Sequence, residues 1–293
     1  MIVVTTPTGQ IGRALLDRLL DADAAVRVIA RDPARLPARV HEKAEIVQGP
    51  HYDKEVLTKA LTNADSVFWN VPPNPAAPSI EGHFDGFTRP FCEAITETGV
   101  GRVVGVSTLG RGAARDAGQI SGALVMDEMI QATGVRYRSL EMPGFMENMR
   151  WNIPSIEAAG MFSSILTPDR KQPSVATRDI AEVAARLMLE PTWDGQEGVQ
   201  VLGPEDISAD DMARVMSEVL GRPIRYQQVS PEDYKAAMTG HGMTEAWAQG
   251  MVDMMTAVDR DGIYHAQPRT PGSRTPTSFR QWCEEELKPA VRP

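Results

Sequence analysis

The chain starts with a short apolar strand that leads into a glycine-bearing turn and then into a helix. Residues 2–4 are Ile-Val-Val, Gly9 and Gly12 follow, and isoleucine and leucine then recur at helical spacing up to residue 20. A glycine at a helix N-terminus lets the backbone approach a phosphate closely, and a second glycine lets the helix pack tightly on the strand. This layout predicts a dinucleotide-binding turn and a fold that begins with a strand–helix unit.

The turn departs from the usual pattern because Thr6 stands where the first glycine is expected. A β-branched residue disfavours positive φ, so we expect a turn that differs from the glycine version. Pro7 has no N–H to offer a phosphate, and the threonine hydroxyls of the turn can replace it as donors. The cofactor-binding residues predicted here are Thr6, Thr8, Gly9, Gln10, Ile11 and Gly12.

The alternation of strand and helix continues through the first half of the chain. Strands separated by helices form βαβ units, and short apolar runs are typical of parallel strands that are covered on both faces. The sequence therefore predicts an α/β fold with a doubly wound parallel Rossmann sheet. The expected strands are 2–4, 26–30, 44–49, 66–71, 102–107, 135–140 and 198–203, and the expected helices between them are 12–20, 54–62, 80–98, 122–133 and 178–190.

Beyond about residue 204 the pattern becomes mostly helical. Ser208 and Ser230 have the sequence context of helix N-caps, the second with Pro231 at the first helical position. We expect a Rossmann domain over 1–150, to which 172–203 return, and a smaller, mostly helical substrate domain over 151–171 and 204–293. The helices expected in the second domain are 206–221, 230–238, 244–258 and 277–287.

Charge and cysteine content exclude several classes of protein. A net charge of −9 disfavours nucleic-acid binding, and Cys92 and Cys283 form no metal-ligand or disulfide pattern. No apolar run approaches the length of a membrane span, and the first expected strand leaves no room for a signal peptide. We expect a cytoplasmic protein that acts on a small molecule, with no metal, no nucleic acid and no membrane. The sequence makes no prediction about the oligomeric state.

The end of the second expected strand indicates which dinucleotide is bound. An acidic residue there suits NAD, whereas an arginine can hold the extra 2′-phosphate of NADP with two parallel hydrogen bonds. The strand ends at Arg31, and Asp32 precedes Pro33 as an expected helix cap. We therefore expect a preference for NADP(H), with NAD(H) as a weaker alternative. The competing interpretation is that Arg31 is only a solvated surface charge.

Several segments together resemble the NmrA-like family, a group of atypical short-chain dehydrogenases/reductases. They are TPTGQIG (6–12), RD (31–32), PP (72–73), STLG (107–110) and EMPGFMENM (141–149). The resemblance covers nearly the whole chain. It implies a Rossmann domain with a smaller C-terminal domain, and binding of NAD(P)(H). It also implies one of two activities, that of an NADPH-dependent reductase or that of a redox-sensing regulator.

The resemblance also implies roles for individual residues. It puts Asn70, Val71 and Pro72 near the adenosine or pyrophosphate, and Ser107 and Thr108 beside the nicotinamide. The loop around Pro143 walls the nicotinamide and the substrate. The predicted cofactor contacts of that loop are Pro143 and Phe145, and the predicted substrate residues are Phe145, Met146, Asn148 and Trp151.

Two departures from the family pattern matter. Gly49-Pro50 stands where many relatives carry Gly-Asp. The tyrosine–lysine proton relay of ordinary short-chain dehydrogenases is also absent, because no tyrosine lies between Tyr52 and Tyr137 and no lysine between Lys59 and Lys171. Reduction of a carbonyl needs a proton donor near the forming alkoxide. The catalytic candidates that remain are Ser107, Thr108, His83 and Glu147.

Each titratable candidate has a simpler alternative. The alternative for His83 is a surface or helix-capping role. The alternative for Glu147 is a structural role as a hydrogen-bond acceptor. Asp127 is interpreted as a solvated position on a helix. The segment 110–122, which contains Arg111, is expected to be a flexible surface loop.

The missing relay favours acceptors that need little help from the protein. The sequence therefore predicts an NAD(P)H-dependent oxidoreductase that passes hydride to a small conjugated carbonyl or quinone-like substrate. The alternative is a non-catalytic NADP(H)-binding redox sensor that regulates a partner protein.

Overall fold

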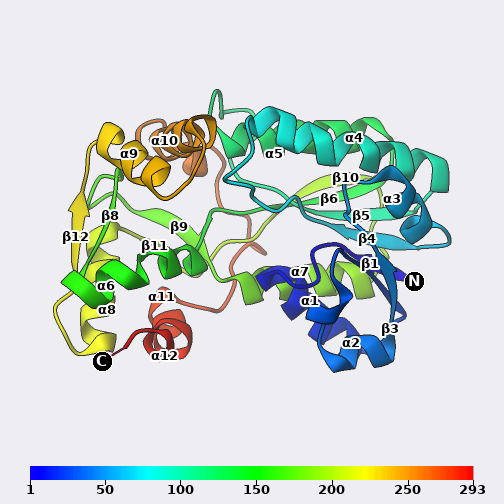
Figure 1. Cartoon of the computed structure of the whole chain (residues 1–293), viewed down its shortest axis with the longest axis horizontal. Coiled ribbons are helices and arrows are strands. Elements are labelled where there is room, and N and C mark those ends of the chain that lie inside the picture. Colours follow the sequence, from blue (N-terminus) through cyan, green and yellow to red (C-terminus); the bar gives the residue numbers. More distant parts are fainter. Residues whose placement is uncertain (293) are drawn as a thin grey trace.

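The computed structural model describes residues 1–292, and its central element is a seven-stranded parallel sheet (Figure 1). The spatial order is β10-β6-β5-β4-β1-β2-β3, so the chain starts in the middle of the sheet and winds outward in both directions. This confirms the predicted doubly wound α/β fold. The strands are β1 (Ile2–Val4), β2 (Val26–Ala30), β3 (Ala44–Gln48), β4 (Ser66–Trp69), β5 (Arg102–Val106), β6 (Arg136–Glu141) and β10 (Gln196–Gln200).

Helices cover both faces of this sheet (Figure 1). Successive side chains of a strand point to opposite faces. Val4 accordingly packs with α1 and α7, whereas Val3 packs with α3, α4 and α5. The strands that are buried on both faces, such as β1 and β4, are largely apolar runs, whereas β3, β6 and β10 also carry polar residues. The bounds are α1 (Gln10–Asp21), α2 (Ala38–Lys43), α3 (Lys54–Leu61), α4 (Ile80–Thr98), α5 (Gln119–Ala132) and α7 (Thr177–Leu189).

The remaining elements gather beyond one end of the large sheet (Figure 1). They include two small sheets, ordered β11-β9-β7 and β12-β8, around a separate core that contains Phe279 and Trp282. The helices are α6 (Ile153–Ala159), α8 (Ala209–Leu220), α9 (Pro231–Gly240), α10 (Glu245–Arg260), α11 (Phe279–Trp282) and α12 (Lys288–Ala290). The strands are β7 (Gly144–Phe145), β8 (Met161–Ser164), β9 (Gln172–Val175), β11 (Asp206–Ile207) and β12 (Arg225–Gln228).

These small sheets add a few short strands, which were not predicted, to a segment that is otherwise mostly helical as expected. Strands such as Arg225–Gln228 are short and largely polar, so they lack the apolar run that marks a buried strand. The expected helix at 206–221 begins only at Ala209, because Asp206 and Ile207 pair with β9. The two predicted caps are confirmed, since the Ser208 and Ser230 side chains accept hydrogen bonds from Asp211 N and Asp233 N.

Helix α10 lies directly against the N-terminal ends of α4 and α5 (Figure 1). A Cβ atom at Gly118, just before α5, would lie 2.0 Å from the carbonyl oxygen of Gly250 in α10. A Cβ atom at Gly250 would lie 2.1 Å from Cδ1 of Ile80 at the start of α4. Only glycine permits this approach, which brings the C-terminal part of the chain close to the segment that follows β5. Within residues 1–292, no helix has the length and apolar character needed to cross a membrane.

Candidate active site

The turn after β1 keeps the left-handed conformation that glycine usually supplies. Thr6 has a φ of 51°, which corrects the expectation that a β-branched residue would change the turn. Two contacts hold it there. The Thr6 carbonyl accepts from Gly9 N at 3.0 Å, and its hydroxyl accepts from Asn70 Nδ2 at 3.1 Å. Tertiary hydrogen bonding therefore offsets the local cost of this conformation, which is about 1–3 kcal/mol.

The two glycines of the turn are required for different reasons. A Cβ atom at Gly12 would lie 2.2 Å from the Thr6 carbonyl oxygen, so this position must be glycine for α1 to pack on the strand. A Cβ atom at Gly9 would lie 3.4 Å from the same oxygen, a contact the protein tolerates with small shifts. Gly9 is also the N-cap of α1 and offers no side-chain cap to the first N–H groups. Thr8, Gly9 and Gln10 are exposed at this end, whereas Ile11 and Gly12 are buried.

The predicted ribose site lies at the end of β2. Arg31 is exposed there, and the Asp32 carboxylate accepts a hydrogen bond from Ala34 N at 3.1 Å. Asp32 therefore caps the short helical turn Pro33–Arg35, as its sequence context predicts. With Asp32 engaged in this way, Arg31 is the charged group that this strand end presents to a ligand.

The segment after β4 connects the turn to the rest of the site. The Thr5 hydroxyl donates to the Phe68 carbonyl at 2.9 Å and accepts from Asn70 N at 3.1 Å. Asn70 in turn holds Thr6, so the carboxyl ends of β1 and β4 are fixed to each other. Val71 and Pro72 follow Asn70. His83 Nε2 lies 2.8 Å from the Pro72 carbonyl oxygen.

His51 is a residue of this region that the sequence did not single out. Its Nε2 lies 3.0 Å from the Asn70 carbonyl, and its ring packs edge-on against Trp69. Burial lowers the pKa of His51 to about 4, and the charge of Arg31 contributes in the same direction. His51 is therefore a neutral donor to the Asn70 carbonyl near pH 7. Its only sequence signal is its place directly after the unusual Gly49-Pro50 pair.

Ser107, just after β5, belongs to a buried polar network between β5, β6 and α5. Its hydroxyl donates to Asp127 Oδ2 at 2.6 Å, and the Tyr137 hydroxyl donates to Asp127 Oδ1 at 2.5 Å. Asp127 has no exposed surface, which corrects its interpretation as a solvated helix position. Burial raises the pKa of Asp127, and its hydrogen bonds to Ser107 and Tyr137 and the charge of Arg111 partly oppose that shift.

Arg111 closes this network toward solvent. Its guanidinium contacts the Asp127 carboxylate and donates to Glu141 Oε1 at 3.0 Å. The expected flexible surface loop at 110–122 is therefore anchored at this residue by two buried carboxylates. Gly105 makes room for the network, since a Cβ atom there would lie 2.4 Å from the Tyr137 hydroxyl.

Two other catalytic candidates are also engaged with the protein. The buried Thr108 hydroxyl donates to the Leu109 carbonyl at 3.1 Å. The Glu147 carboxylate accepts from Thr177 N at 3.0 Å and from the Thr177 hydroxyl at 2.8 Å. Glu147 thus caps the N-terminus of α7, the structural role that the sequence offered as its alternative.

The loop after β6 places its predicted residues on different surfaces. Pro143 is buried and Phe145 is partly buried against the core that contains α1 and β1. Met146 is 3% exposed and packs into the separate core of the C-terminal part, so it faces away from solvent. Asn148 is exposed, and Trp151 is 84% exposed. The structure therefore brings Phe145, but not Met146 or Trp151, toward the residues at the ends of β1 and β5.

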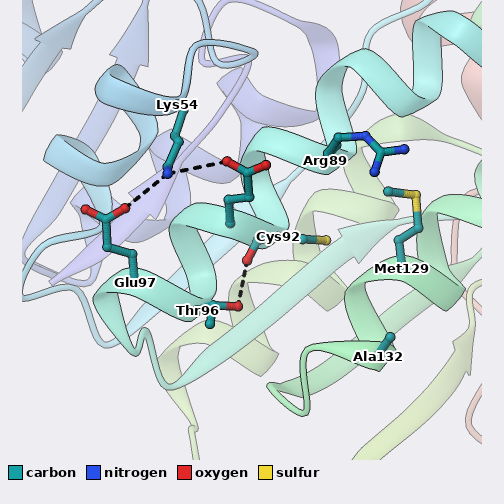
Figure 2. A pocket seen from close by; sticks show the side chains of 8 residues that line it. Lys54, Arg89, Cys92, Thr96, Glu97, Met129 and Ala132 are labelled. Atoms are coloured by element: carbon teal, nitrogen blue, oxygen red, sulfur yellow. Dashed lines mark hydrogen bonds and ion pairs between the residues drawn. The ribbon is translucent and has the colours of Figure 1, made fainter.

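A surface hollow lies elsewhere, on α4 and α5. This hollow has a volume of about 640 Å³, and Lys54 contacts Glu93 at 3.4 Å and Glu97 at 3.5 Å in it (Figure 2). Burial raises the pKa of Cys92, which also lines it, to about 11. None of the predicted cofactor or substrate residues contributes to its lining. We therefore assign the candidate site to the end of the parallel sheet, where open α/β sheets bind ligands.

Comparison with known proteins decides the family. The sequence profile of the NmrA-like family matches residues 1–269. The chain belongs to the NmrA-like family. The resemblance inferred from the short segments is thereby confirmed over more than the first 150 residues.

Two full-length relatives are reductases by name. A (4-alkanoyl-5-oxo-2,5-dihydrofuran-3-yl)methyl phosphate reductase of Streptomyces griseus is 30% identical over 98% of each chain. An NAD(P)H azoreductase of Xenophilus azovorans is 28% identical over 93% of each chain. The crystal structure of an NADPH-dependent quinone oxidoreductase of Escherichia coli, complexed with NADPH, superposes with a TM-score of 0.77 at 22% identity, over 90% of this chain and 91% of that one. These names agree with the predicted enzyme class.

Proposed function

We propose that the protein is an NADPH-dependent reductase that transfers hydride to a small conjugated carbonyl or quinone-like compound. The observation that carries this proposal is the turn of Thr6, Gly9 and Gly12 with Arg31 at the end of the adjacent strand. A glycine-capped helix N-terminus suits a pyrophosphate, and an exposed guanidinium at this strand end suits a 2′-phosphate. The reductase names of full-length relatives support the same activity.

The residues present fit a nicotinamide dinucleotide. The N-terminus of α1 has no acidic residue in its first turn and no side-chain cap, so its N–H groups suit a phosphate. Thr6, Thr8, Gly9 and Gln10 would hold the pyrophosphate. Arg31 would hold the 2′-phosphate. The nicotinamide side would be formed by Ser107, Thr108, Pro143 and Phe145. A bound dinucleotide supplies the hydride, and the protein supplies orientation and electrostatics.

In this proposal, one part of the chain binds the cofactor and the other part covers the substrate. Residues 1–150 and 172–203 form the cofactor-binding part, and residues 151–171 and 204–293 form the part that covers the substrate. Phe145 and Asn148 lie where the chain passes from the first part to the second. Contact of α10 with the ends of α4 and α5 supports this arrangement, because it puts the second part over the ends of β4 and β5.

Titration of the protein with NADPH and with NADH tests the cofactor assignment. Mixing the NADPH-loaded protein with acceptors tests turnover. We expect NADPH to bind at least about tenfold more tightly than NADH, as two charge-assisted hydrogen bonds imply. NADPH-loaded protein is then mixed with quinones, enones and aldehydes in single-turnover experiments. Oxidation of NADPH by quinones or enones supports the proposal, and tight binding without oxidation by any of these acceptors contradicts it.

A second candidate function has one observation in its favour. The hydrogen atoms of Ser107 and Thr108 are directed at protein acceptors, and the Glu147 carboxylate caps α7. Such a site would suit a redox sensor that binds NADP(H) and signals to a partner protein without reducing a substrate. A sensor requires that the NADPH-bound and NADP⁺-bound forms of the protein bind a partner with different affinities.

A further inference from the structure

The reductase needs a proton donor that the predicted residues do not supply. Ser107 gives its single hydroxyl hydrogen to Asp127, and Thr108 gives its hydrogen to Leu109. His83 faces the Pro72 carbonyl, which only accepts hydrogen bonds, so the Nε2 hydrogen is used there. A proton donor supplied by the protein would therefore come from a different part of the chain.

Tyr264 reaches the same place from the C-terminal part of the chain. It lies in the short helical turn Ile263–His265, which follows α10. Ile263 approaches the loop after β5 so closely that a Cβ atom at Gly110 would lie 3.4 Å from its Cδ1. Tyr264 itself packs with the cluster that includes Ala117 and Ile120, at the start of α5. The Thr108 side chain is near enough to oppose part of the rise in the pKa of Tyr264 that burial causes.

The Tyr264 hydroxyl has the properties of a donor held ready for a ligand. Within residues 1–292, it donates to no backbone or side-chain acceptor at hydrogen-bond distance, unlike those of Tyr137 and Tyr226. The side chain is partly buried. Burial raises the pKa of Tyr264 to about 12, so the phenol keeps its proton near neutral pH.

We infer that Tyr264 is the catalytic proton donor of the reductase, an inference that rests on the proposed function. Bound NADPH would supply the hydride for a new C–H bond at the conjugated carbon of the acceptor, with its own C–H bond broken and NADPH oxidised to NADP⁺. The π-electron pair moves onto the carbonyl oxygen, and the Tyr264 O–H bond breaks as that oxygen takes the proton. The Tyr264 phenolate then regains a proton from water.

Two kinds of acceptor separate proton donation from hydride transfer. An enone needs a hydride and a proton, whereas a cationic triarylmethyl dye needs only the hydride because its reduced form is neutral. We compare wild type, Tyr264→Phe and the control Tyr234→Phe in single turnovers of NADPH. Tyr234 is also partly buried, but it lies in α9. Loss of a general acid lowers rates by about 10²–10⁴-fold.

The inference predicts a loss of at least about 100-fold for the enone in Tyr264→Phe, and a change of no more than about threefold for the dye. Equal losses for both acceptors would show a purely structural role and overturn it, as would an unchanged enone rate. A wild type that reduces the dye but not the enone also overturns it. A wild type that reduces neither acceptor overturns the proposed function itself.

A spectroscopic measurement gives a readout other than turnover. The infrared C=O stretch of an enone bound together with NADP⁺ shifts to lower frequency when a hydroxyl donates to its oxygen. We expect this shift in wild type and in Tyr234→Phe, and its loss in Tyr264→Phe. The same shift in all three proteins would contradict donation by Tyr264.

Discussion

The hydroxyl of Ser107 donates a 2.6 Å hydrogen bond to the carboxylate of Asp127, which is completely buried. Ser107 follows β5 and Asp127 lies in α5, so this bond fixes the end of a central strand to a helix on the sheet. A hydroxyl carries one hydrogen, so Ser107 meets a ligand with its lone pairs only. Its position beside the site therefore suits orientation of a ligand better than donation of a proton.

Replacing Asp127 with asparagine should destabilise the fold. The amide cannot accept from Ser107, Tyr137 and Arg111 together, and the Arg111 charge loses one of its two partners. We expect the free energy of unfolding to fall by about 1–3 kcal/mol in urea denaturation. Glu128→Gln, at the exposed neighbouring position, is the control and should change it by less than about 0.5 kcal/mol. An Asp127→Asn variant as stable as this control would contradict the network.

His51 should make stability depend on pH in the acid range. Its pKa is lowered from 6.5 to about 4 in the folded protein, so the unfolded chain binds the proton more readily. The contribution of His51 is present above pH 6.5 and is lost as the pH falls toward 4. It amounts to about 3 kcal/mol.

The measurement compares the free energy of unfolding of wild type and His51→Asn between pH 6.5 and about pH 4. The variant should lack this part of the acid destabilisation, whereas the control His241→Asn, at an exposed position, should retain it. If His51→Asn and wild type lose the same stability on acidification, His51 is not buried in its neutral form.

The two glycines of the first turn should respond differently to alanine. Gly12→Ala forces a Cβ atom against the Thr6 carbonyl, and we expect a loss of about 1–3 kcal/mol in unfolding free energy. Gly9→Ala has room within the protein, so stability should change little while NADPH affinity falls by about tenfold or more. Calorimetric titration and thermal unfolding of both variants check this. Unchanged NADPH affinity in Gly9→Ala would contradict a phosphate at this turn.

Arg31 should determine how much more tightly the protein binds NADPH than NADH. Arg31→Asp is expected to weaken NADPH binding at least about tenfold and to leave NADH binding unchanged, because only NADPH carries the 2′-phosphate. The ratio of the two dissociation constants is the readout, and NADH serves as the internal control. An equal loss of affinity for both would contradict the assignment of Arg31 to that phosphate.

The central strands of the large sheet were predictable because they obey a simple rule. Runs such as Val26–Ala30 and Ser66–Trp69 are buried on both faces, and a short apolar run is their direct signature. The strands β8 and β12 have no such signature. They pair with each other at the surface and carry polar residues, such as Gln227 opposite Ser163, so only tertiary structure reveals them.

The candidate site was predictable where a backbone requirement fixes a residue type. Gly9, Gly12 and the Asp32 cap follow from local geometry, which short sequence patterns record. Thr6 and Asp127 differ, because their conformation or burial depends on partners distant in sequence, namely Asn70 and the pair Ser107 and Tyr137. Tyr264 lies still farther from Thr108 along the chain, and no local pattern connects the two.

Transfer of deuterium from the cofactor tests the central claim most directly. The protein is incubated with an enone and NADPH that carries deuterium at the nicotinamide C4, in each of its two configurations, and the product is analysed by mass spectrometry. We predict that one of the two cofactors places a single deuterium on a carbon of the product, in a reaction that requires the protein. Absence of product with both cofactors, or product without deuterium from either, would contradict the assignment of this chain as a hydride-transferring reductase.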